Sequence, residues 1–215
     1  MRSTAVAAAV SACALLAAGC SVPGEERGFT PAGVVAGQRS GGSQPAPAPS
    51  VETVAVAPGL TVQIEWPEAL EPAHTAMVKA LTGTYTAQWR AVGSLGEDES
   101  YLGAVEDAAS RDAYTWVHGF VSEKLSARGV AKIYGLRVAS VSGRGAEVDA
   151  CVEESGVRVT DKNGDPIAEQ PLWTKPPRST YLQVAAVRKG DDGAWRVKLF
   201  QHAAYPDERA KECVR

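Results

Sequence analysis

Three kinds of chemical pattern are missing from this 215-residue sequence. It has three widely separated histidines and no Cys-x-x-Cys pair, which excludes a recognisable zinc motif. It has no Gly-x-Ser-x-Gly segment of the kind that presents a nucleophilic serine. Asp161–Asp165 begins like a calcium loop, but Pro166 stands where that loop needs glycine and Leu172 where it needs glutamate. We therefore expect neither a metal nor a cofactor.

Clustered positive charge is also missing. The chain has 22 Lys and Arg against 25 Asp and Glu, a formal net charge of −3. Its longest basic cluster is Arg188–Lys189, which is followed closely by Asp191 and Asp192. Phosphate backbones are bound by clustered Lys and Arg, so we expect no nucleic acid as a partner.

No apolar run is long enough to be a good membrane-spanning helix, which needs roughly 20 strongly apolar residues. The longest one, from Ala5 to Ala18, follows Arg2 and precedes small residues, as in an export signal. Its end, Leu16–Cys20, resembles the bacterial lipobox. That resemblance implies a signal peptide at 1–19 and a diacylglycerol on Cys20, which would anchor the protein to the outer face of the cell membrane. The alternative is a plain secretory signal that ends in a cysteine by chance.

The four cysteines divide by position. Cys13 lies in the signal peptide and Cys20 is the predicted lipid attachment site, which leaves Cys151 and Cys213. Two thiols in an oxidising compartment are expected to pair, so we predict a Cys151–Cys213 disulfide. The alternative is two unpaired buried thiols.

Residues 20–50 are dominated by Gly, Pro, Ser and Ala and predict a tether, with a single α+β domain at 51–215. Spacings of three to four residues predict the helices, and alternation predicts the strands. The expected helices run from near Glu68 or Pro72 to Gly93 and over 107–128, with a helical turn at 101–105. The expected extended segments and strands are 54–56, 60–64, 133–141, 146–154, 157–160, 181–188 and 194–202. A loop is expected at 161–179. Helices followed by antiparallel strands are typical of an α+β fold.

Some segments resemble a known group of proteins. Tyr85-x3-Trp89, the Ala127–Gly129 helix end and Val148–Ser155 resemble uncharacterised actinobacterial lipoproteins over about residues 60–213. The order of elements resembles the cystatin-like, or nuclear-transport-factor-2-like, cone. The resemblance implies N-terminal helices packed on a curved antiparallel sheet, with a pocket at its open end.

The resemblance also implies candidate pocket residues. Enzymes with the cone fold place Asp, His and Tyr in the pocket, which gives the candidates Tyr85, Tyr114, His118, Asp149 and His202. Trp89 is a further possible pocket or recognition residue. Each has a structural alternative. Tyr85 lies on an apolar stripe and fits the core, and Tyr114 and His118 lie about 100° from the Trp116–Phe120 stripe. Asp149 shares a strand face with other acids, and such a face is usually solvated.

Trp173 lies in the long loop among prolines, where binding residues are often found. We interpret it as part of a recognition or lid segment, or equally as a packing residue. For function, we expect non-catalytic binding of an envelope protein or a small apolar ligand. The alternatives are a pocket enzyme of the isomerase or dehydratase type and an oligomeric adaptor of an envelope secretion or conjugation assembly. An enzyme needs an open pocket with at least two convergent ionisable groups.

Overall fold

The computed structural model describes residues 49–215 of the chain. The signal peptide, Cys20 and all of the tether before Pro49 lie outside these residues, so what the sequence indicates for them stays a prediction. Within 49–215, no helix combines the length and the apolar character needed to cross a membrane.

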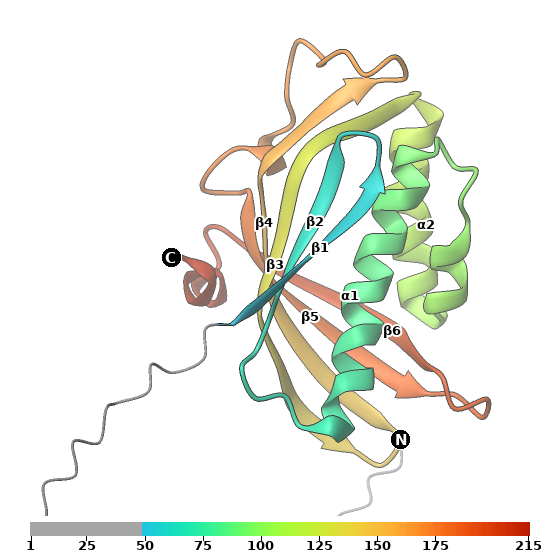
Figure 1. The fold of residues 1–215 in the computed structure, drawn as a ribbon, viewed down its shortest axis with the longest axis vertical. Coiled ribbons are helices and arrows are strands. Elements are labelled where there is room, and N and C mark those ends of the chain that lie inside the picture. Colours follow the sequence, from blue (N-terminus) through green and yellow to red (C-terminus); the bar gives the residue numbers. More distant parts are fainter. Residues whose placement is uncertain (1–48) are drawn as a thin grey trace, which may run out of the picture. The chain divides into compact units, whose positions relative to one another are not determined.

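The described chain forms one sheet and two long helices (Figure 1). The strands are β1 (Ser50–Ala57), β2 (Leu60–Trp66), β3 (Leu125–Ser142), β4 (Gly145–Asp161), β5 (Thr180–Lys189) and β6 (Trp195–Ala204). The helices are α1 (Pro72–Gly93) and α2 (Asp107–Ser122), with short 3-10 turns η1 (Ser100–Ala104), η2 (Leu172–Thr174) and η3 (Glu208–Cys213).

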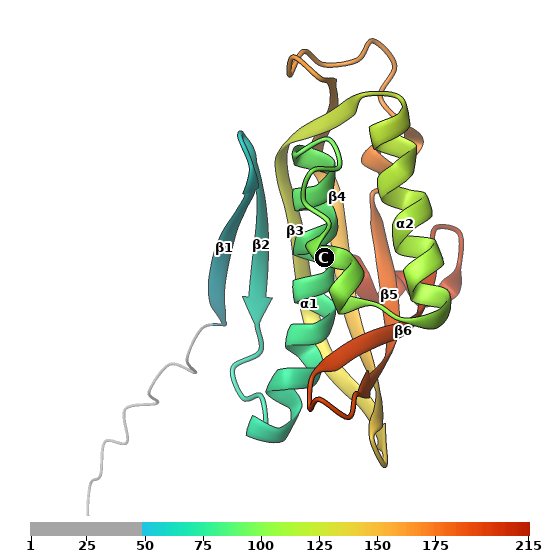
Figure 2. The ribbon, with the colours of Figure 1, turned by 90° about the vertical axis from the view of Figure 1, so that its right-hand side faces the viewer.

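The six strands lie in the sheet in the order in which they occur in the sequence. Neighbouring strands are antiparallel except β2 and β3, which are parallel because α1 and α2 lie between them in the chain and carry it back across the sheet. Figures 1 and 2 show both long helices on the same face of the strongly curved sheet. The expected α+β class, helices packed on a curved and mainly antiparallel sheet, is confirmed.

Each long helix buries the stripe that its spacing predicts, because an amphipathic helix is stabilised by burying its apolar face against a partner. The α1 residues that point at the sheet include Met77, Val78, Leu81, Tyr85, Trp89 and Val92. Those of α2 are Ala109, Ala113, Val117 and Phe120. The core therefore lies between the helices and the sheet.

The predicted end of the second helix is wrong. We expected a helix to Arg128, but α2 ends at Ser122 and β3 begins at Leu125. Lys124 adopts a left-handed backbone conformation, with φ of 56°, which stops the helix. Leu125 has the spacing of the helical stripe and also suits a half-buried strand, so the pattern alone does not separate the two.

Gly129 has a different role from the helix stop that we predicted. It lies inside β3 with φ of 109°, and a Cβ there would be 2.1 Å from the carbonyl oxygen of Gly156 on β4. The two glycines let the paired strands approach closely. The expected strands at 146–154 and 157–160 are correspondingly one continuous strand, β4, which contains Gly156.

The predicted disulfide is confirmed: Cys151 on β4 is bonded to Cys213 at the end of η3. It holds the C-terminal segment on the face of the sheet opposite the helices (Figure 1). The Tyr134 hydroxyl donates a hydrogen bond to the Cys213 carbonyl, and Arg215 forms a two-point ion pair with Glu65 at 2.9 Å.

Candidate functional site

A cavity of about 130 Å³ lies between the helices and the helix-covered face of the sheet. Five elements contribute side chains to it, two helices and three strands. The lining residues are Tyr85 and Gln88 from α1, Asp112, Ala113 and Trp116 from α2, Glu154 from β4, Tyr181 and Gln183 from β5, and Phe200 and His202 from β6.

A buried carboxylate, that of Glu154, lies in this cavity. Alternate residues of β4 face the helices, and Glu154 continues the series of buried Val148 and Val152 into the pocket. Only 5% of Glu154 is exposed. Its Oε1 atom accepts hydrogen bonds from the hydroxyls of Tyr85, at 2.7 Å, and Tyr181, at 3.4 Å. These contacts tie the strand to α1 and to β5.

Burial raises the pKa of the Glu154 carboxyl to about 7, although the hydrogen bonds from the two tyrosines act in the opposite direction. Burial, and next the charge of Glu154, raise the pKa values of Tyr85 and Tyr181 well above 10. Both phenols therefore remain protonated donors near neutral pH. Glu154 is a pocket group whose charge changes near neutral pH.

Two polar groups in the cavity lack a partner within the described chain. Glu154 Oε2 makes no hydrogen bond to residues 49–215, and neither does the side-chain amide of Gln183, a residue that is 3% exposed. Both residues line the cavity, and neither the Oε2 atom nor the amide group is completely enclosed, so both groups remain accessible from the cavity. Both groups therefore keep hydrogen-bonding capacity that water or a ligand in the cavity can use.

His202 lies at the edge of the cavity. Its ring stacks on that of Tyr181, with centroids 5.5 Å apart and planes at 11°, and it meets Phe200 edge to face. Desolvation of the imidazole lowers the pKa of His202, while the charge of Asp112 opposes this effect. The structure therefore brings together two of the predicted residues, Tyr85 and His202.

The two predicted tryptophans lie in an aromatic cluster behind the cavity. Trp89 is fully buried and packs edge to face on Trp116, with centroids 4.9 Å apart. Trp173 is half-buried, and its ring centroid lies 6.2 Å from the ring centroids of both Trp89 and Phe120. Trp173 thus occupies the packing position that we gave as the alternative to a lid.

The remaining predicted residues lie outside the cavity. Tyr114 and His118 stack on each other on the exposed surface of α2. Asp149 is on the opposite face of the sheet, as its alternation predicts, but it is 5% exposed rather than solvated. The reason is that η3 covers this face, and Arg137 pairs with Asp149 at 2.7 Å and with Glu212 at 2.9 Å.

Of the ten lining residues, sequence reasoning named only Tyr85 and His202, and the residues that it missed include Asp112, Glu154, Tyr181 and Gln183. Glu154 could have been predicted from the sequence, because strand alternation places it on the apolar face of its strand. Tyr181 and Gln183 reach the cavity through the pairing of β5 with β4, in which they lie opposite Val152 and Ala150. That register is set by contacts distant in sequence.

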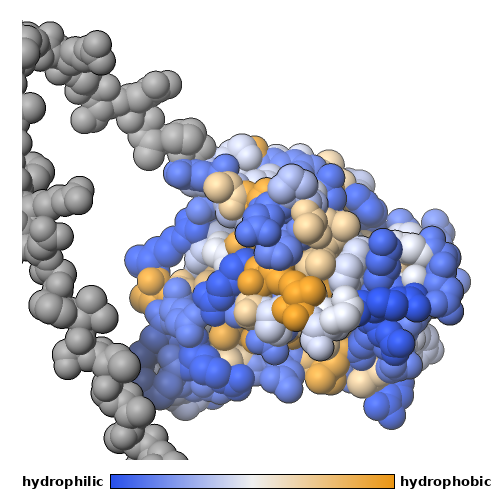
Figure 3. Space-filling model, turned by 90° about the horizontal axis from the view of Figure 1, so that it is seen from below, coloured by the Kyte–Doolittle hydropathy of each residue, from blue (hydrophilic) through white to orange (hydrophobic). Residues whose placement is uncertain are grey.

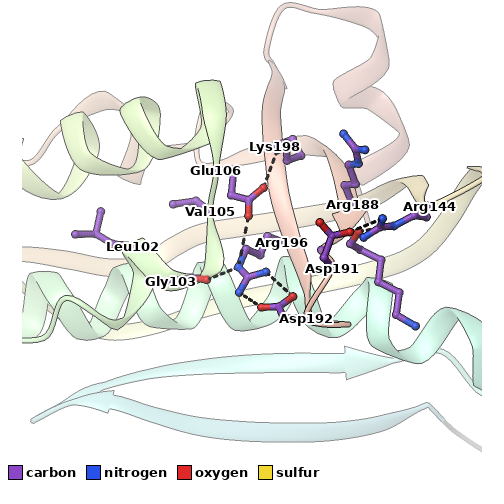
Figure 4. A pocket seen from close by; sticks show the side chains of 12 residues that line it. Leu102, Gly103, Val105, Glu106, Arg144, Arg188, Asp191, Asp192, Arg196 and Lys198 are labelled. Carbon is purple, nitrogen blue, oxygen red and sulfur yellow. Dashed lines mark hydrogen bonds and ion pairs between the residues drawn. The ribbon is translucent and has the colours of Figure 1, made fainter.

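A second, wider hollow of about 680 Å³ lies near the β3–β4 and β5–β6 turns (Figure 4). Its charges are largely paired: Arg196 with Asp192, Lys198 with Glu106, and Arg144 with an exposed aspartate. Arg196 holds the pKa of the Asp192 carboxyl down at about 2. Seen from below, this end of the domain is mainly hydrophilic, with a small apolar cluster (Figure 3). Paired, solvent-exposed charges are typical of an ordinary surface.

No group of three or more His, Cys, Asp or Glu side chains within residues 49–215 is arranged to hold a metal ion. The cavity itself presents carboxyl, imidazole, phenol and amide groups.

No protein-family model matches this chain, and no curated protein sequence matches it. Among solved structures, the intermembrane space region of the chloroplast protein ARC6 is 16% identical with a TM-score of 0.44, over 63% of this chain and 99% of that one. A protein of Novosphingobium aromaticivorans provisionally named an aromatic ring hydroxylase is 11% identical, with a TM-score of 0.42 over 63% and 92%. Another from that organism, provisionally named a scytalone dehydratase, is 14% identical, with a TM-score of 0.39 over 60% and 83%. Similarities this low carry no information about a ligand or a reaction.

Proposed function

We propose that this protein is a lipid-anchored extracytoplasmic domain that binds a small molecule in the cavity under α1 and α2. The observation that carries the binding role is the pair of accessible polar groups, Glu154 Oε2 and the Gln183 amide, inside a largely aromatic lining. A ligand with an apolar body and one polar group would satisfy both features of the site.

The size of the cavity limits what can enter. Ligand pockets for drug-sized molecules occupy roughly 300–1,000 Å³, whereas this cavity has about 130 Å³. The site therefore fits a compact molecule, or one end group of a larger ligand.

Binding can be tested by blocking the cavity. Gln88 is half-buried at its edge, so Gln88→Trp would place an indole across the opening. Lys79→Trp, on an exposed position of the same helix and outside this cavity, is the matched control. We expect small aromatic alcohols such as benzyl alcohol to shift the NMR signal of the Trp116 indole in the wild type and in the control, and not in Gln88→Trp. Equal shifts in all three proteins would contradict the proposal.

The membrane anchor rests on the resemblance of Leu16–Cys20 to a lipobox. We expect the mature protein to begin at Cys20, to carry the mass of a diacylglycerol and to partition into detergent. Cys20→Ala should abolish the added mass and the partitioning. An unmodified full-length product that remains in the aqueous phase would overturn this part of the proposal.

Proton-transfer catalysis is the second candidate function. It is favoured by one observation, the carboxyl group of Glu154 with a pKa of about 7 at a ligand-accessible cavity, because a general acid or base works best when its pKa is near the working pH. His202 supplies the second ionisable group. The test is exchange of the α-protons of small ketones and enones in D₂O. Glu154→Gln should abolish any exchange above background, and equal exchange in both proteins would exclude Glu154 as the base.

A further inference from the structure

The charged groups of the cavity have one sign. Two carboxylates, those of Glu154 and Asp112, line it, and neither Lys nor Arg is among its lining residues. His202, the remaining basic group, has a lowered pKa and is neutral near pH 7. An anionic ligand would therefore meet repulsion here, and a cation would meet attraction.

The aromatic lining favours the same class of ligand. Four rings line the cavity together with the imidazole: Tyr85, Trp116, Tyr181 and Phe200. The faces of such rings attract cations, by about 0.5–1 kcal/mol per exposed contact and more where water is excluded. Aromatic rings around a carboxylate are a typical arrangement for substituted ammonium groups.

We propose that the cavity binds a compact organic cation, such as a substituted ammonium group, through its aromatic rings and the carboxylate of Glu154. This inference rests on the ligand-binding role proposed above and names the class of ligand. A neutral apolar ligand would desolvate the ionised carboxylate without a countercharge, which is costly, whereas a cation supplies that countercharge.

Binding is then linked to protonation. The titratable groups that share the cavity with Glu154 are Tyr85 from α1, Asp112 from α2, Tyr181 from β5 and His202 from β6. A cation favours the ionised carboxylate, so it binds best above the pKa of about 7 and releases a proton when it binds below that pH. The ionised fraction of Glu154 rises roughly thirtyfold between pH 5.5 and pH 8, which sets the largest increase in affinity that this group can give. Protonation of His202 acts in the same direction, so the dependence that remains in Glu154→Gln belongs to His202.

The test compares two probes of the same shape. Choline carries a trimethylammonium group, and 3,3-dimethyl-1-butanol has carbon in place of the charged nitrogen. Titration of the full chain at pH 8, followed by the Trp116 indole signal, should show choline binding at least tenfold more tightly. Calorimetry at pH 6 in buffers of different ionisation enthalpy should show a proton released with choline and none with the alcohol.

Two variants distinguish cation binding in the cavity from a general effect of surface charge. Glu154→Gln should weaken choline binding at least tenfold at pH 8. Glu153→Gln removes the same charge from the opposite face of the same strand, where Glu153 pairs with Lys132, and should leave binding unchanged. Equal losses in the two variants would overturn the inference.

The outcomes also distinguish this inference from the proposed function. If the neutral alcohol binds as tightly as choline, the cation inference fails and the ligand-binding role stands. If choline, the alcohol and benzyl alcohol all leave the Trp116 signal unchanged at millimolar concentrations, the ligand-binding role fails and the inference fails with it.

Discussion

Glu154 should make the stability of the domain fall as the pH rises. The carboxyl has a pKa of about 7 in the folded protein against 4.5 when it is free in water. Between these values the unfolded chain has released the proton and the folded chain still holds it, so a higher pH favours unfolding. At about 1.4 kcal/mol per pH unit, the full effect is about 3 kcal/mol. It is absent below pH 4.5 and complete above pH 7.

The assay is urea unfolding of the wild type and Glu154→Gln at pH 5 and pH 8.5, followed by tryptophan fluorescence. Glutamine is neutral at both values, so the wild type should lose about 2 to 3 kcal/mol more than the variant between them. Comparison with the variant removes the effects of His202 and of the surface carboxylates, which are common to both proteins. If both proteins show the same dependence on pH, Glu154 is not a buried acid with a raised pKa, and the argument for the site fails.

Three further changes test the frame around the site. Replacing Cys151 and Cys213 with serine opens a 62-residue link and should lower the free energy of unfolding by up to about 4 kcal/mol; a loss below ~1 kcal/mol would show that the C-terminal segment is held by its other contacts. Trp173→Ala should cost about 2 to 3 kcal/mol in urea unfolding, whereas an unchanged stability would return Trp173 to a recognition role. Gly129→Ala should cost at least ~2 kcal/mol, because its Cβ overlaps the carbonyl of Gly156, and a stable variant would show that the strands can separate there.

Much of the fold could be predicted because its patterns are local. The α1 stripe and the strand alternation each depend on residues within a short window. The misplaced end of α2 and the misread role of Gly129 came from backbone conformations that no side-chain pattern expresses. Lys124 ends α2 with a positive φ, and Gly129 serves a close approach between strands.

The site was harder to predict because its members meet through the register of the strands. Gln183 and Tyr181 reach the cavity only because β5 pairs with β4 at Ala150 and Val152. Strand alternation in the sequence places Glu154 on the apolar face of its strand. However, an acid at the end of an apolar series is normally at the surface. Burial of that acid depends on Tyr85, 69 positions earlier in the chain.

For Asp149, two correct predictions combined would have given the right environment. Its strand alternation places it on the same face as Cys151, and the disulfide requires Cys213 to lie on that face too. The C-terminal segment must therefore cover the acids there. The expectation of a solvated face was wrong because the disulfide places the C-terminal segment over this face.

Asp149 and Glu154 are two buried acids on one strand, and the difference between them supports the location of the site. Asp149 has its own countercharge, since the guanidinium of Arg137 lies 2.7 Å away under a covering segment. Glu154 has two neutral phenols and, within residues 49–215, no cationic partner. A buried charge without a partner is destabilising, so a group of this kind is kept where something other than folding requires it. The first acid is explained by the structure alone, whereas the second fits the ligand that we propose for the cavity.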